Sequence, residues 1–180
     1  GSVPMHVLLQ GDVGTGKTLV ALRAMLQVVD AGGQAVLLAP TEVLAQPHHA
    51  SITRMLGSLA EGGLLGGAEH ATRVALLTGS MNAATRRRVL LDIATGEAGI
   101  VVGTHALLQD GVQYHDLGLI VVDEQHRFGT NQRKQLAKKD TRMPHLLSMT
   151  ATPIPRTLAL TIYGDLDITL LDEMPKGRKP

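Results

Sequence analysis

The chain has 180 residues, enough for one domain with a buried core. Its composition of 44% hydrophobic and 18% charged residues excludes an intrinsically disordered protein. A net charge of +1 excludes a surface that is basic throughout, and the absence of cysteine excludes disulfides and thiol catalysis. No apolar run is long enough to span a bilayer, and the first residues do not resemble a signal peptide.

Short apolar runs alternate along the chain with longer segments of helical pattern. The six runs are residues 7–9, 35–39, 74–77, 100–102, 119–122 and 146–149. They lack alternation of polar and apolar residues, which is typical of parallel strands covered on both faces. The pattern predicts an α/β fold with a mainly parallel central sheet and helices on both faces.

Three helices are predicted between these strands, over residues 18–33, 41–59 and 83–96. The first and third segments end in glycine, a common helix stop. Pro47 lies inside the second segment and removes a backbone donor, so we expect a kink or a late helix start there. The glycine-rich residues 61–70 predict a loop, and residues 171–180 predict a linker.

The sequence GDVGTGKT follows the first predicted strand and begins the first predicted helix. Its glycines let backbone N–H groups surround an anion, and the helix dipole adds to the attraction. Lys17 can reach the β- and γ-phosphates, and the Thr18 hydroxyl can ligate Mg²⁺. The alternative is a glycine-rich turn with a solvated lysine. The predicted nucleotide-binding residues are Gly11, Asp12, Val13, Gly14, Thr15, Gly16, Lys17 and Thr18.

Two adjacent acids end the apolar run in LIVVDEQH. Ligands of open α/β sheets bind at the carboxyl ends of strands, where Asp123 can hold Mg²⁺, usually through its water shell. Glu124 can then orient or deprotonate an attacking water. The alternative is a pair of exposed turn acids.

Small hydroxyl residues follow three other predicted strands. Thr150 and Thr152 lie in SMTATPIPR, at the end of an apolar run. Thr41 in LAPTEVLAQ is a predicted N-cap after a strand, and Thr104, followed by His105 in VGTHALL, is predicted to cap a helix in a similar way. Helix N-termini and hydroxyls suit contacts with nucleic-acid phosphates, and ordinary helix capping is the alternative. With only two tyrosines and one phenylalanine, base stacking has little to work with.

The arginine run and the histidines carry weaker signals. Arg86, Arg87 and Arg88 spread over most of a helical turn, so a solvated face competes with phosphate contact. His48 and His49 are adjacent and point apart on a helix, and no zinc-ligand spacing is present, so we expect no zinc site.

Taken in order, GDVGTGKT, APTEVLA, LLTGS, VGTHALL, VVDEQHRFG and SMTATPIPRTLA resemble the first RecA-like motor lobe of superfamily 2 helicases. The resemblance covers nearly the whole chain, with residues 1–170 as the lobe. DEQHRFG with TATPIPRTLA narrows it to the RecG family of branched-DNA helicases. Transcription-repair coupling factors (Mfd) have a similar series but typically carry Glu where this chain has Gln125.

The resemblance implies roles for individual residues. Lys17, Asp123 and Glu124 would be catalytic, with Thr18 and Asp123 at the metal, partly through water. The residues that would couple the nucleotide site to DNA are Gln125, His126, Thr150 and Thr152, with His126 near the TAT segment. The residues along the DNA path would be Pro40, Thr41, Gly79, Gly103, Thr104 and His105.

The resemblance also implies ATP and Mg²⁺ as cofactors and translocation on duplex DNA that remodels stalled forks and recombination junctions. We expect a monomeric bacterial cytoplasmic protein that meets branched DNA, a second RecA-like lobe and a wedge domain. Because an adenine-recognising segment and the second lobe's arginines are not found, we expect an excised lobe that hydrolyses little ATP alone. A coupling-factor lobe and a nucleotide-binding docking module without motor role remain the alternatives.

Overall fold

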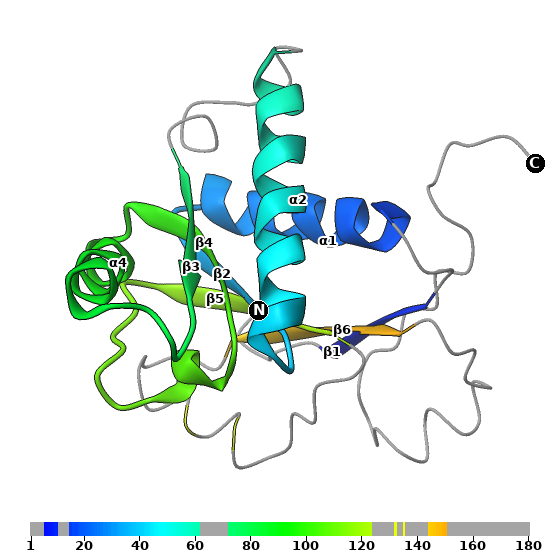
Figure 1. The fold of residues 1–180 in the computed structure, drawn as a ribbon. Helices are drawn as coiled ribbons and strands as arrows, with labels where there is room; N and C mark the ends of the chain where they lie inside the picture. The colour runs from blue at the N-terminus through cyan, green and yellow to red at the C-terminus, as the bar shows by residue number, and fades with distance from the viewer. Residues whose placement is uncertain are drawn as a thin grey trace, which may run out of the picture.

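A computed structural model describes residues 6–10, 15–61, 72–123, 132, 135 and 144–150, with side chains described from Lys17 onward except at Thr150. The ten elements, shown in Figure 1, are β1 (His6–Gln10), α1 (Thr15–Asp30), β2 (Gln34–Leu38), α2 (Glu42–Glu61), β3 (Arg73–Leu77), α4 (Ala83–Thr95), β4 (Ala98–Gly103), the 3₁₀ helix η1 (His105–Leu108), β5 (Leu117–Val122) and β6 (His145–Thr150). All six predicted strands and all three predicted helices are confirmed.

The strands form one parallel sheet in the order β1-β6-β5-β2-β4-β3. The central strand β2 is buried along its whole length, as the unbroken apolar run predicts. Its side chains alternate between two hydrophobic clusters, since Ala35 and Leu37 join one while Val36 and Leu38 join the other. The predicted fold class is therefore confirmed.

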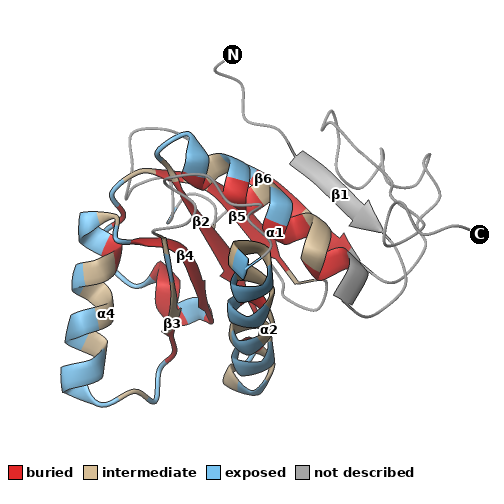
Figure 2. Ribbon diagram, turned by 90° about the horizontal axis from the view of Figure 1, so that it is seen from above, coloured by how far each residue is buried: buried red, intermediate tan, exposed pale blue. Residues whose placement is uncertain are grey.

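Helices cover both faces of this sheet. α1 and α2 pack over the cluster that contains Leu37, and α4 with η1 packs over the cluster that contains Leu38. Figure 2 shows the sheet largely buried and the outer surfaces of α2 and α4 exposed. Within η1's cluster, the Tyr114 hydroxyl donates to the Leu107 carbonyl at 3.1 Å, and burial raises the pKa of Tyr114. No helix in the described ranges is long and apolar enough to cross a membrane.

Pro47 does not delay the start of α2, which begins at Glu42 and runs through the proline to Glu61. Of the two alternatives predicted for Pro47, the late start is therefore wrong, while the kink stays a prediction. Pro47 is the sixth residue of the helix and removes only the bond to the Val43 carbonyl. Val43 is 79% exposed, so water can reach this part of the helix. Of the loop predicted over residues 61–70, Glu61 ends α2 and the other positions lie outside the described residues, as do residues 171–180.

The carboxyl ends of the strands lie in register, and this positions the candidate site. Leu38 pairs with Val122 of β5 on one side and with Gly103 of β4 on the other. The ladder continues one step, because the Asp123 N–H donates to the Leu38 carbonyl at 3.0 Å and the Ala39 N–H donates to the Gly103 carbonyl at 2.8 Å. The segments that follow β2, β4 and β5 therefore start from one edge of the sheet.

Candidate active site

The amino end of α1 holds the described part of the phosphate loop. α1 begins at Thr15, shortly after β1 ends at Gln10, and its first turn carries no acid that would offset the helix dipole. Residues 11–14 lie outside the described residues, and for Thr15 and Gly16 only the backbone is described. The strand–loop–helix context predicted for this motif is present.

Lys17 and Thr18 are buried in the first turn of α1, with 7% and 8% of their surfaces exposed. Among the described residues, no hydrogen bond or ion pair involves the Lys17 side chain. A buried ammonium without a partner is costly, so this position fits an anion such as a phosphate group. The hydroxyl of Thr18, on the same turn, is a suitable oxygen ligand for Mg²⁺.

Asp123 lies at the carboxyl end of β5, on the same edge of the sheet as the end of β1. Only β6 separates these two strands, so their carboxyl ends lie roughly 10 Å apart. The Asp123 side chain is 17% exposed, and its Oδ2 lies 2.8 Å from Nε2 of His48 on α2. A partly exposed carboxylate at this edge fits a hard cation, directly or through water. Glu124, Gln125, His126 and Thr152 lie outside the described residues, as does the side chain of Thr150, so their roles stay predictions.

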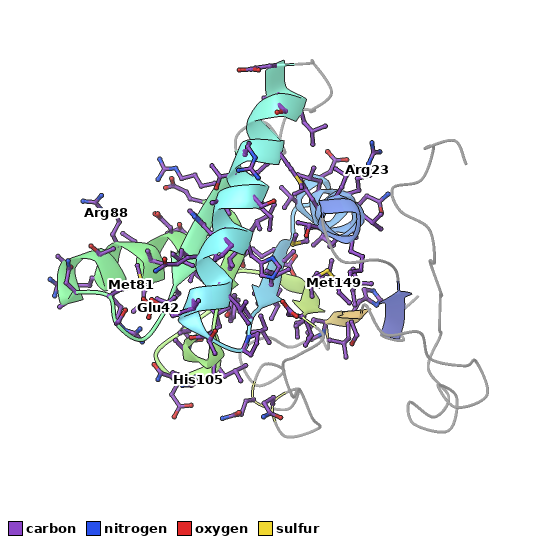
Figure 3. All side chains as sticks on the ribbon, turned by 45° about the vertical axis from the view of Figure 1, so that its right-hand side comes forward. Arg23, Glu42, Met81, Arg88, His105 and Met149 are labelled. Atoms are coloured by element: carbon purple, nitrogen blue, oxygen red, sulfur yellow. The ribbon has the colours of Figure 1, made fainter. Side chains whose placement is uncertain are left out.

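The segment between β2 and α2 contains the predicted contacts Pro40 and Thr41. The Thr41 hydroxyl accepts from the Leu44 N–H at 3.3 Å, so the predicted N-cap is confirmed. Glu42 follows, and its two carboxylate oxygens lie 2.7 and 2.6 Å from the Ser80 hydroxyl, which can donate to either. Figure 3 shows Glu42 beside Met81 at the amino end of α2. The two motifs APTEVLA and LLTGS are therefore tied together at this edge.

The other predicted contacts follow β3 and β4. Gly79 is exposed, and a Cβ there would meet nothing within 4 Å. Gly103 is buried, and a Cβ there would overlap the Leu77 carbonyl oxygen, so close strand packing accounts for this glycine. Thr104 is 4% exposed and accepts from the Ala106 N–H at 3.3 Å, while the neighbouring His105 is exposed. Thr104 caps η1, which is a short 3₁₀ helix rather than a longer α-helix.

The arginine run on α4 divides as its spacing predicts. Arg86 donates from Nη2 to the Gln109 Oε1 at 3.0 Å, whereas Arg87 and Arg88 are exposed. α4 covers the face of the sheet opposite α1 and α2, and Figure 3 shows Arg88 far from Met149 of β6. The run is therefore mainly a solvated face that does not point to the nucleotide edge.

The two adjacent histidines point to different partners, as predicted. His49 Nε2 lies 3.2 Å from the Val74 carbonyl oxygen, and His48 meets Asp123. Sequence reasoning missed the His48–Asp123 contact, although a signal was present. Ala45 and Ile52 are the buried residues of α2, and position 48 lies on the same stripe at helical spacing. A polar residue on a buried stripe needs a partner.

Three comparisons relate this chain to known proteins. The model of the family described as "DEAD/DEAH box helicase" matches residues 3–161. ATP-dependent DNA helicase RecG of Mycobacterium leprae is 63% identical over 98% of this chain, and RecG of Streptococcus pneumoniae is 53% identical over 98%. The chain spans about a quarter of these relatives, 24% in both cases.

Among solved structures, RecG bound to a three-way DNA junction aligns with a TM-score of 0.74 and 41% identity, over 98% of this chain and 22% of that one. The DEAD-box helicase Mss116 bound to single-stranded RNA aligns with a TM-score of 0.67 but 18% identity, which supports the fold alone. The resemblance to RecG inferred from the motifs is confirmed at the level of sequence.

Proposed function

Because this chain belongs to the DEAD/DEAH box helicase family, we propose that it is the first motor lobe of a RecG-type, ATP-dependent translocase that remodels branched double-stranded DNA. One observation carries the proposal: the Asp123 carboxylate and the buried Lys17, which has no partner within the described ranges, lie on one edge of a parallel sheet. The similarity to RecG supports the choice of branched DNA, because that relative is bound to a three-way junction.

In the proposed mechanism, the backbone of residues 11–18 surrounds the phosphates of ATP, and Lys17 neutralises the β- and γ-phosphates. Thr18 and Asp123 would hold Mg²⁺, Asp123 partly through water. When bound, this ion neutralises charge that develops on the phosphates. Glu124 orients or deprotonates the attacking water. Gln125, His126, Thr150 and Thr152 transmit the state of the nucleotide to the DNA side.

The DNA side of the lobe consists of the segments that follow β2, β3 and β4. Three exposed residues can contact phosphates: Thr41 through its hydroxyl, Gly79 through backbone with no side chain or neighbour in the way, and His105 through its ring. Pro40, Gly103 and Thr104 are less exposed and complete the proposed DNA path beneath these contacts. Contacts of this kind follow the phosphate backbone, which suits a motor that must move along any sequence.

The second RecA-like lobe and a wedge domain are proposed partners within the full-length protein, which acts as a monomer in the bacterial cytoplasm. An arginine supplied by another lobe can be worth on the order of 10³- to 10⁵-fold in turnover. We therefore expect the 180-residue chain alone to hydrolyse very little ATP, even with forked DNA present. Steady-state turnover equal to that of the full-length protein would refute this dependence.

The decisive test is Glu124→Gln in the full-length protein, measured as ATP hydrolysis stimulated by forked DNA. We expect stimulated hydrolysis to fall by roughly 100-fold or more while binding of a fluorescent ATP analogue persists. Glu97→Gln is the control, since Glu97 is an exposed acid directly before β4, at the amino ends of the strands and away from the nucleotide site. Hydrolysis that survived Glu124→Gln would favour a nucleotide-binding docking module instead.

A DNA-binding assay separates RecG-type activity from coupling-factor activity. Binding to three-way and four-way junctions by the full-length protein alone is the expected result. A requirement for RNA polymerase would favour the coupling factor. Salt concentration must be fixed in these assays, because binding dominated by phosphate contacts falls steeply as salt rises.

A further inference from the structure

The contact between His48 and Asp123 joins two parts of the molecule that sequence reasoning kept separate. His48 lies on α2, and Asp123 ends β5, yet His48 Nε2 and Asp123 Oδ2 are 2.8 Å apart. Both side chains are partly withdrawn from water, with 20% and 17% of their surfaces exposed. A hydrogen bond to a carboxylate in such a place is shorter and stronger than one between exposed neutral groups.

An aspartate carboxylate rotates easily about its last torsion, so a metal-binding carboxylate needs a partner to fix its orientation. Ligands of bound metals are commonly held by such outer hydrogen bonds, and loss of one typically costs about 10- to 100-fold in metal affinity or activity. His48 makes a contact of this type with Asp123. The donor set fits the ion, because Asp123 and Thr18 both offer hard oxygen atoms.

α2 connects the same histidine to the proposed DNA path. The first turn of α2 is capped by Thr41 and tied to the segment after β3 through Glu42 and Ser80. His48 lies six residues after Glu42, within two turns of this end of the helix. A displacement of the amino end of α2 by DNA would therefore reach the Asp123 carboxylate through a short, regular element.

We propose that His48 is a positioning residue that orients the Asp123 carboxylate for the magnesium ion of the bound nucleotide and links that carboxylate to the helix at the DNA path. This inference rests on the proposed function. His48 touches neither nucleotide nor DNA in this role, and it acts through Asp123 alone.

The first test measures Mg²⁺-dependent binding of a fluorescent ADP analogue to the full-length protein, without DNA. In His48→Ala we expect the Mg²⁺ concentration at half-maximal binding to rise about tenfold, while binding without Mg²⁺ is unchanged. His48→Gln should recover most of the loss, since its amide nitrogen can take the place of Nε2. An unchanged Mg²⁺ midpoint in His48→Ala would overturn the proposal.

The matched control is His49→Ala, on the same helix, which loses a contact to the Val74 carbonyl instead. We expect its Mg²⁺ midpoint to stay within about twofold of the unmodified protein, because the half-buried His49 makes no contact with Asp123. Equal shifts in His48→Ala and His49→Ala would mean that both act through the stability of α2, and would overturn the specific role. Weaker nucleotide binding by His48→Ala in the absence of Mg²⁺ would also overturn the specific role of His48.

A double variant keeps the test decisive even if His48→Ala lowers stability. If His48 acts through Asp123, then adding His48→Ala to Asp123→Asn should change the Mg²⁺ midpoint by less than about twofold. Independent, additive effects would contradict the proposal. Because this assay uses neither DNA nor hydrolysis, its failure is distinct from a failure of the motor function tested with Glu124→Gln.

The link to DNA is tested by repeating the Mg²⁺ titration with forked DNA present. Forked DNA should lower the Mg²⁺ midpoint of the unmodified protein, and His48→Ala should remove most of that change. If forked DNA shifts the midpoint of both proteins equally, or of neither, the link through His48 is wrong.

Discussion

The two ends of β2 place polar groups in opposite situations. At the amino end, the buried Gln34 side chain donates from Nε2 to the Ile93 and Ala98 carbonyls, both at 2.9 Å. Its Oε1 accepts from the N–H groups of His115 and Asp116 at 2.7 and 2.9 Å. Both donors and both acceptor positions of the amide are thus used within the protein.

On the carboxyl side of the sheet, Lys17 follows β1 and Asp123 follows β5, and both charges lie where a ligand can bind. Lys17 is buried without a partner among the described residues, and the Asp123 carboxylate remains 17% exposed beside His48. The difference shows how a structural polar group is told from a functional one. A group whose bonds are all made internally stabilises the fold, whereas a buried charge such as Lys17, without a partner among the described residues, favours a ligand.

The largest expected effect on stability is at Gln34. Gln34→Leu roughly keeps the side-chain volume but removes one hydrogen bond from each of two buried carbonyls and two N–H groups. We expect the free energy of unfolding of this chain to fall by about 3 kcal/mol, measured by urea denaturation. A loss below about 1 kcal/mol would indicate that water replaces the amide. The contrast between the two ends of the sheet would then not hold.

Gly103 and Gly79 test the distinction between structural and functional residues on the carboxyl side of the sheet, where both were predicted to lie along the DNA path. Gly103→Ala should lower the free energy of unfolding by about 2 kcal/mol, because the added methyl group overlaps the Leu77 carbonyl. Gly79→Ala should change it by less than about 0.5 kcal/mol, because the space is open.

The pair also separates structure from function. Junction-DNA binding by full-length Gly79→Ala should weaken although its denaturation curve is unchanged. Unchanged binding would remove Gly79 from the proposed path, and equal stability losses in the two variants would contradict the packing account of Gly103.

Apart from the Gly79 control, the smallest expected loss of stability is at the cap of α2. Thr41→Ala removes the acceptor for the Leu44 N–H, and we expect a loss of about 1 kcal/mol in the free energy of unfolding by urea denaturation. Thr41→Ser keeps the hydroxyl and should retain most of the stability. If Thr41→Ser proves as unstable as Thr41→Ala, the methyl group rather than the cap matters.

The sequence was sufficient for the sheet, because unbroken apolar runs such as residues 119–122 and the strand–loop–helix motif at Lys17 are local patterns. It was not sufficient for the contacts that complete the site. His48 and Asp123 are 75 residues apart, and Gln34 bonds groups 59 to 82 residues away. Such contacts depend on strand order, which no local pattern specifies. Of the kink or late start predicted at Pro47, the late start is wrong because packing of α2 on the sheet outweighs one lost backbone bond.

The strand order also sets a sequence of events during synthesis. Within the described part of the chain, the only neighbour of β1 is β6, and Val7 pairs with Leu147. The ribosome therefore releases β1 and the phosphate-loop segment well before β6, the described strand with which β1 pairs. Pairings this distant in sequence form slowly and leave an unpaired strand exposed meanwhile. A nascent chain should thus acquire nucleotide binding late and abruptly, and until then β1 is a segment for chaperones to protect.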